Sequence, residues 1–455
     1  MEKKKGSLKS TIAVSLTNYL DAGAIVAGAS GLTLWKDYLG LTEGHLGWLN
    51  AISANCLGAA IGAIIGGFLA DKYGRKAIYT YNMLIYMLGV AIIVISTNFP
   101  MLLTGFLITG ISVGVGVPAS WTYISESSET NNRGRNIGIS QMAWGIGPLI
   151  ILILGFLLAP PTGSEGTGGY LFVIVEKFVE TFVGDSVSGA ELNVFSSRIV
   201  FGSLFVVAFI AWLLQRQLEE SKEWKAAKAE ESKHEKSGTF ASFGKLFTNR
   251  INVRTMIFLA GMYLTWNLVS SVMGFFQPHI YETAGGLTNE HANMLAAAQW
   301  VIIILMTFVF AMLVDKVNQR ILYFYGVGAA VLAWLIIITI GINSMSGLLF
   351  FTLLWGIQGG ISVQGFYALW ASELFPAKYR AAAQGIMFFM VRGLSAIWGI
   401  VFVYIYGEGG EGFTLAAYLM AALLLVSLVI GTVWTPKTRG KTLEQITKER
   451  YGDEI

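Results

Sequence analysis

The sequence predicts an all-α integral membrane protein with twelve transmembrane helices in two pseudo-symmetric six-helix halves. Hydrophobic residues make up 54% of the 455 residues and charged residues only 13%, about half the charged share of a soluble domain. Twelve apolar stretches are long enough to cross about 30 Å of hydrocarbon. Short motifs of the first six stretches return in the last six, about 245 residues later. These three observations indicate a duplicated membrane fold.

The twelve predicted spans follow one another with a single long interruption. They cover 10–35, 45–70, 76–97, 99–125, 135–159, 197–215, 254–280, 289–314, 320–342, 346–372, 381–406 and 412–434. The interruption has mixed charges and no long apolar run, so we interpret it as a soluble linker. The predicted organisation is an N-terminal half (1–215), a cytoplasmic linker (216–250), a C-terminal half (251–434) and a cytoplasmic tail (435–455).

Lysines and arginines mark the predicted cytoplasmic side. They gather at the N-terminus and after the second and fourth spans, at Lys3, Lys4, Lys5, Lys9, Lys72, Arg75, Lys76, Arg133 and Arg135. Segment 160–197 instead carries five carboxylates and one lysine. By the positive-inside rule, both termini of this cell-membrane protein are cytoplasmic and 160–197 is external. Its apolar part is too short and too charged to span, so we expect a small helix over the outer mouth.

Two charges lie deep within predicted spans. A charge at such depth costs at least a few kcal/mol unless it is paired, hydrated or protonated. Asp21 stands in "NYLDAGAIVAG" (18–28) and Arg392 in "FFMVRGLSAIWG" (388–399). Each lies about 18 Å along a helix from a cytoplasmic basic residue, Lys9 or Arg380. We therefore expect both charges in one polar cavity between the halves.

The two halves share motifs at their predicted cytoplasmic loops. Ser-Glu followed by Arg seven positions after the Glu occurs at Glu126/Arg133 and again at Glu373/Arg380. "ADKYGRK" (70–76) is echoed by "VDKVNQR" (314–320). Two similar halves are typical of transporters, and their substrate sites lie between the repeats near the midplane.

Four segments carry a resemblance to a known family. "GFLADKYGRK" (67–76) resembles the loop signature of the major facilitator superfamily. "LEESKEW" (218–224), "SELFPAKYR" (372–380) and "TPKTRGKTLEQI" (435–446) resemble motifs of its sugar-porter-like branch. The position of Arg392 also resembles the organic cation and anion transporter branch. The resemblance implies the fold of this superfamily and transport by alternating access.

The resemblance also implies a cytoplasmic gate made of ion pairs between the halves. Individually weak pairs at a wet interface can break and reform within one cycle. Carried over onto this sequence, the gating residues are Asp71, Arg75, Glu126, Arg133, Glu220, Asp315, Arg320, Glu373 and Arg380. The alternative is that these charges anchor helix ends.

The predicted substrate site departs from the sugar-porter pattern. Gln141 falls where that family places a sugar-binding glutamine, but the span-seven signature is replaced by "TWNLVSSVMGFFQPHIY" (265–281). The span-four position of the family's arginine holds Phe106. The residues we expect to contact substrate are Gln141, Trp144, Trp266, Asn267, Gln364, Tyr367 and Arg392.

The two buried charges each allow more than one role. Asp21 is predicted to be the proton-coupling residue, with direct substrate binding and a structural role as alternatives. Arg392 would hold a substrate carboxylate or phosphate, pair with Asp21, or be satisfied structurally by backbone carbonyls.

These observations predict a proton-coupled symporter of a sugar or sugar-like solute, sugar acids included. A transporter of small organic or aromatic acids, a uniporter and a transport-dead sensor are the alternatives. An enzyme is not expected, because the sequence has no Walker loop, no nucleophile elbow and no metal-ligand cluster among its four histidines. We expect no cofactor, metal or nucleic acid; the expected partners are the solute, protons and the lipid bilayer, and the expected state is a monomer.

Overall fold

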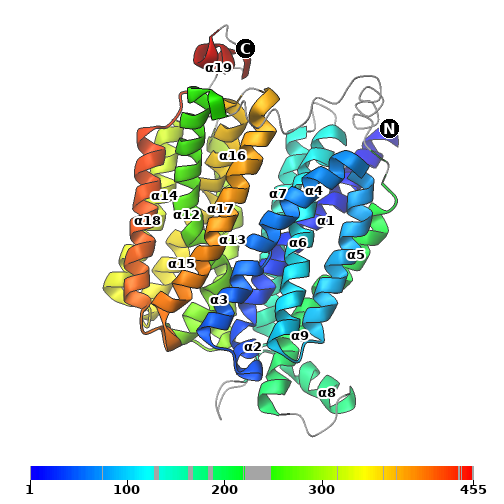
Figure 1. Cartoon of the computed structure of the whole chain (residues 1–455). Helices are drawn as coiled ribbons and strands as arrows, with labels where there is room; N and C mark the ends of the chain where they lie inside the picture. Colours follow the sequence, from blue (N-terminus) through cyan, green and yellow to red (C-terminus); the bar gives the residue numbers. More distant parts are fainter. Residues whose placement is uncertain are drawn as a thin grey trace. The chain divides into compact units, whose positions relative to one another are not determined.

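The computed structural model describes most of the chain. The described residues are 2–73, 75–127, 133–161, 168–182, 188–218, 220, 247–314, 316–361, 363–375, 377–438, 441 and 443–452. Throughout these ranges the regular structure is helical (Figure 1).

The helices follow in chain order and keep the labels of Figure 1. They are α1 (Glu2–Ser30), α2 (Leu32–Leu39), α3 (Glu43–Ile52), α4 (Leu57–Tyr73), α5 (Arg75–Val94), α6 (Phe99–Ser127), α7 (Arg133–Leu157), α8 (Phe172–Phe182), α9 (Gly189–Gln215), α12 (Arg250–Thr283), α13 (Asn289–Leu313), α14 (Gln319–Ile340), α15 (Met345–Gly360), α16 (Val363–Leu374), α17 (Ala377–Tyr406), α18 (Phe413–Val433) and α19 (Leu443–Tyr451).

The predicted membrane fold is confirmed. Eleven segments of the described chain are long and apolar enough to cross a membrane, and Met142–Leu157 in α7 is a shorter apolar helix. Two of the predicted spans are each built from two helices, α3 with α4 and α15 with α16. The small helix expected in 160–197 is α8, which packs against α9.

Two predicted span boundaries are wrong. The first span was predicted to reach residue 35, but α1 ends at Ser30 and α2 begins at Leu32. At the junction a Cβ on Gly31 would collide with the Ser197 hydroxyl, so the chain needs glycine there to pass α9 closely. The sixth span was predicted to begin at 197, but α9 begins at Gly189 because the Ser188 hydroxyl accepts the Glu191 N–H at 3.2 Å and caps it.

The chain divides into two compact units. Unit 1 comprises Met1–Lys233, Ser271–Trp300 and Ala396–Phe413; unit 2 comprises His234–Ser270, Val301–Ser395 and Thr414–Ile455. The parts of α12 and α13 that belong to unit 1 bond to its N-terminal helices. The Asn55 side chain donates to the Ser271 carbonyl at 2.7 Å, and Asn293 donates to the Ser30 carbonyl at 3.2 Å. The division into an N-terminal and a C-terminal six-helix half, which the order of the spans predicts, remains a prediction.

Glycines bring α4 and α6 into close contact within unit 1. A Cβ on Gly62 would collide with the Ile111 carbonyl oxygen, and one on Gly114 with the Ala59 carbonyl oxygen. Small residues at such crossings let membrane helices approach until their backbones touch. The pair therefore depends on glycine for its spacing and not for backbone conformation.

We expect Gly114→Leu to destabilise the protein strongly. The added side chain has to push α4 away from α6, and overpacking of this kind costs about 1–3 kcal/mol or more. Fluorescence-detected size-exclusion chromatography and the thermal unfolding midpoint in detergent measure the loss. Gly202→Leu in α9 is the matched control, because a Cβ there meets no described heavy atom within 4 Å. Equal midpoints for both variants would show that the crossing tolerates separation.

The predicted tail contains a docked helix. In unit 2, the Tyr451 hydroxyl of α19 donates to Asn252 Oδ1 at 2.7 Å and contacts the Leu374 carbonyl at 3.2 Å. Arg450 donates to the Thr255 hydroxyl at 2.5 Å. These bonds tie α19 to the start of α12 and the end of α16.

Candidate functional site

Asp21 and Trp144, both predicted from the sequence, lie together in unit 1. Asp21 is 8% exposed in the middle of α1. The Trp144 indole of α7 donates from Nε1 to Asp21 Oδ2 at 3.3 Å. The Tyr86 hydroxyl of α5 lies within electrostatic reach of Asp21 and donates to the Leu20 carbonyl at 3.0 Å. The carboxylate is thus held by an indole donor among aromatic rings.

Phe106 belongs to the packed core of unit 1. Its ring lies edge-on to Phe201, with centroids 5.8 Å apart, and to Phe275, at 6.2 Å. A Cβ on Gly28 of α1 would meet the Phe106 ring at 2.9 Å. The position at which the sugar-porter resemblance implies an arginine is therefore filled by an aromatic ring packed directly on α1.

An aromatic group forms in unit 2 around two other predicted residues. The rings of Tyr263 and Tyr367 stack with centroids 4.3 Å apart and planes 11° from parallel. Tyr263 also stacks with Trp266, at 5.9 Å. The Trp266 indole donates to Gln358 Oε1 at 3.0 Å. The Tyr367 hydroxyl is buried and has no hydrogen-bond partner among the described residues.

Asn267 and Arg392 complete this group in unit 2. The Ser395 hydroxyl of α17 donates to Asn267 Oδ1 at 2.9 Å. The Arg392 guanidinium lies 5.0 Å from the ring centroid of Phe388, one turn earlier in α17, and within electrostatic reach of Tyr263. Gln364 is partly buried on α16, three residues before Tyr367.

The predicted gate is described only in part. Glu220 Oε2 accepts the Lys76 backbone N–H at 3.1 Å, which ties the start of the linker to α5. Arg320 is exposed at the start of α14, and Glu373 is partly buried on α16. The side chains of Asp71, Arg75, Glu126, Arg133, Asp315 and Arg380, and that of the predicted ligand Gln141, lie outside the described residues.

Sequence reasoning missed Tyr263 and Ser395. Tyr263 stands three residues before Trp266, so the two rings share one face of α12. This spacing could have identified it. Ser395 carried no such signal, because its bond to Asn267 joins residues 128 positions apart.

Residues 11–400 match the sequence profile of the Major Facilitator Superfamily. The chain belongs to this superfamily. The family predicted from the loop motifs is thereby confirmed.

Relatives within the Major Facilitator Superfamily include sugar-porter-like transporters. The minor myo-inositol transporter IolF of Bacillus subtilis is 39% identical over 450 residues, 98% of this chain and 94% of the relative. The niacin transporter NiaP of Acinetobacter baylyi is 33% identical over 156 residues, 33% of this chain and 35% of the relative. The inward-open structure of the xylose transporter XylE from E. coli matches with a TM-score of 0.72 at 18% identity, covering 97% of this chain and 99% of that one.

The described part of this Major Facilitator Superfamily member contains two groups of side chains that are candidates for the functional site. One is the Asp21–Trp144 pair of unit 1, and the other is the aromatic and amide group of unit 2. Among the described residues, no group of three or more His, Cys, Asp or Glu side chains could hold a metal ion. The chain is thus a multi-pass, sugar-porter-like membrane transporter with one acidic and one aromatic candidate site.

Proposed function

We propose that the protein is a proton-coupled symporter of a polyhydroxylated ring such as myo-inositol or a sugar. The main observation in favour of proton coupling is the buried carboxylate of Asp21. A carboxylate inside a membrane helix is stable only where it is hydrogen-bonded or takes up a proton. The similarity to IolF along nearly the whole chain supports the substrate class. Both termini lie in the cytoplasm, and the protein works as a monomer by alternating access.

The aromatic group of unit 2 supports binding of such a ring. A cyclic polyol has an apolar C–H face and a rim of hydroxyl groups. The Tyr263, Tyr367 and Trp266 rings offer flat apolar surface, while the Gln358 and Asn267 amides offer donors and acceptors for hydroxyls. The Tyr367 hydroxyl adds a polar atom without a described partner. Gln141, Gln364 and Trp144 remain further proposed contacts.

Uptake into proteoliposomes tests the proposal. With labelled myo-inositol outside, an inward proton gradient is expected to drive accumulation above the outside concentration, and a protonophore is expected to abolish it. A thermal-shift screen of sugars, polyols and organic acids identifies the ligand, because a bound solute stabilises the folded protein by mass action. Equal uptake with and without a proton gradient would show that the protein is a uniporter and not a proton-coupled symporter.

Arg392 favours a second candidate, transport of small organic acids. Its guanidinium beside the aromatic group would bind a carboxylate through two parallel hydrogen bonds. The partial similarity to the niacin transporter of Acinetobacter baylyi supports this reading.

Arg392→Gln separates the two candidates. If the solute is an acid, the variant loses a charge-assisted bond of about 1.5–3 kcal/mol, so its Kd rises roughly 10- to 100-fold. If the solute is neutral, the Kd changes less than about threefold. Isothermal titration with myo-inositol and with nicotinate measures both. Arg216→Gln, at the exposed end of α9, is the control.

The predicted cytoplasmic gate remains part of the proposal. Asp71, Arg75, Glu126, Arg133, Glu220, Asp315, Arg320, Glu373 and Arg380 would form the ion pairs that close the inner side. The bond from Lys76 to Glu220 supports a role for Glu220 at this surface.

A further inference from the structure

A chain of polar side chains joins α2, α3, α12 and α13 within unit 1, and the proposed transport site does not use it. His279 is 1% exposed and Glu43 6% exposed. Their facing atoms, His279 Nε2 and Glu43 Oε2, are 3.6 Å apart, and neither has a hydrogen-bond partner among the described residues. Buried polar atoms left in this way are costly. A proton between them would satisfy both.

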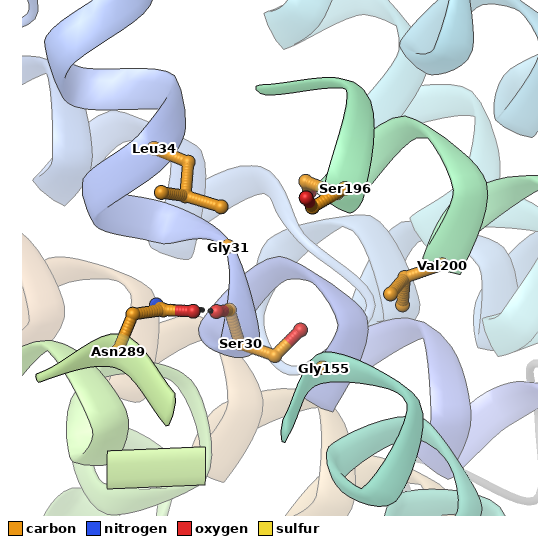
Figure 2. A pocket seen from close by; sticks show the side chains of 8 residues that line it. Ser30, Gly31, Leu34, Gly155, Ser196, Val200 and Asn289 are labelled. Atoms are coloured by element: carbon orange, nitrogen blue, oxygen red, sulfur yellow. Dashed lines mark hydrogen bonds between the residues drawn. The ribbon is translucent and has the colours of Figure 1, made fainter. Parts of the chain in front are cut away.

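The other ring nitrogen of His279 extends the chain. His279 Nδ1 lies 3.1 Å from the Thr33 hydroxyl of α2, which also bonds to the Glu282 carboxylate. Asn289 of α13 donates to Glu282 Oε1 at 2.9 Å and to the Ser30 carbonyl at 3.2 Å. Figure 2 shows Asn289 and Ser30 at the edge of a small cavity, with Gly155 beside Ser30 and Ser196 across from them. A continuous polar path therefore leads from Glu43 to this cavity.

Carboxylates outnumber cations around His279. Lys36 of α2 pairs with Glu43 Oε1 at 2.5 Å and is the cation of the group. The Asp37 carboxyl, next to Lys36 on α2, interacts electrostatically with both Glu282 and His279. Partial burial raises the pKa of the Asp37 carboxyl, while Lys36 and His279 oppose this shift.

One tyrosine completes the surroundings of His279. The ring centroid of Tyr406 on α17 lies 6.3 Å from that of His279, and its hydroxyl bonds to Thr283 at 2.5 Å. Three carboxylates, one ammonium group and one phenol thus face the imidazole. One added proton lowers the net negative charge of this group.

The number of donor hydrogens around His279 determines which hydrogen bonds can form with and without an added proton. The Thr33 hydroxyl has one hydrogen but two neighbours that accept, Glu282 and a neutral His279 Nδ1. Neutral imidazole has one N–H, so it cannot donate to both Thr33 and Glu43. Protonated imidazole donates from both nitrogens, and Thr33 is then free to donate to Glu282. One added proton, on the ring or on a facing carboxylate, lets every partner be satisfied at once.

We propose that His279 and Glu43, linked through Thr33 to Glu282, form a proton-binding site of unit 1 that is separate from Asp21. The bound proton completes the hydrogen bonds between the end of α12 and helices α2 and α3. These contacts therefore tighten at acidic pH and loosen when the proton leaves.

Nitrogen-15 NMR of histidine-labelled protein in detergent tests the site directly. The ring signal that disappears in His279→Gln is expected to show both ring nitrogens protonated at acidic pH and to lose one proton as the pH is raised. In Glu43→Gln the proton is expected to leave the ring at a lower pH than in the wild type, because the facing carboxylate is gone. His291→Gln is the matched control, because His291 is exposed on α13 and contacts Thr288.

Two results would overturn the site. One is a His279 ring that keeps a single protonation state from about pH 4 to 9. The other is a midpoint that Glu43→Gln leaves within about 0.3 pH unit of wild type. If His279→Gln does not fold, a soluble paramagnetic agent assigns the signals, because His279 is 1% exposed and stays sharp. The measurement needs no transported solute, so failure of the transport proposal would appear separately, in the uptake assay.

Discussion

Asp21→Asn is expected to abolish proton-driven accumulation while leaving substrate exchange largely intact. Asparagine keeps the shape of the side chain and an oxygen that can accept the Trp144 indole N–H, so the local packing of α1 and α7 survives. It cannot bind and release a proton in the physiological range. The accumulation ratio in proteoliposomes should therefore fall to about one, which is simple equilibration, under a proton gradient that drives the wild type far above it.

Counterflow identifies the cause of the loss. A coupling residue is not needed when labelled solute exchanges for unlabelled solute, so counterflow in Asp21→Asn should stay within a few-fold of wild type. Glu180→Gln is the control, because Glu180 is an exposed carboxylate on α8. Loss of counterflow together with binding would make Asp21 a substrate ligand. Accumulation that survives would place the coupling proton elsewhere in the chain.

Trp266→Ala is expected to weaken substrate binding about 10- to 2,000-fold. The change removes one ring of the stack with Tyr263 and leaves Gln358 Oε1 without its indole donor. An unpaired buried acceptor costs about 1–3 kcal/mol, and a lost aromatic contact adds about 0.5–1.5 kcal/mol. The Kd from isothermal titration measures the effect.

Trp266→Phe separates the contribution of the aromatic ring from that of the indole N–H. Phenylalanine keeps a ring for stacking but has no N–H, so its Kd should lie between those of wild type and Trp266→Ala. It also guards against misfolding, because Trp266 is 4% exposed and its truncation leaves a cavity. Trp48→Ala is the control, since Trp48 is 51% exposed on α3. Unchanged affinity in both Trp266 variants would move the site away from this aromatic group.

The family and the all-helical membrane fold could be predicted from the sequence because both depend on local patterns. A span is a run of apolar residues whose length is set by the thickness of the hydrocarbon, and the loop motifs are contiguous. Asp21 was identified in the same way, because one carboxylate in an apolar run is conspicuous without knowledge of its neighbours.

Boundaries and kinks could not be read from these patterns. An apolar run continues through Gly31, so nothing in hydropathy ends the first span at Ser30. The break depends on how closely α9 approaches, which is a property of packing. The breaks between α3 and α4 and between α15 and α16 could not be predicted from the sequence for the same reason, since apolar residues lie on both sides of each break.

The pairing of polar side chains was decided only by tertiary structure. By itself the sequence determined that Asp21 and Trp266 stand within membrane helices. It could not show that Trp144 donates to Asp21 across 123 positions, or that Gln358 accepts from Trp266 across 92. His279 could be weighed from the sequence only as a metal ligand, yet it lies between Glu43 and Thr33, 246 positions from the latter. The hydrophobic pattern specifies which segments are buried in the membrane, because the free energy of transfer to hydrocarbon depends on each residue alone. Which polar side chains then form hydrogen bonds with one another depends on how the helices pack.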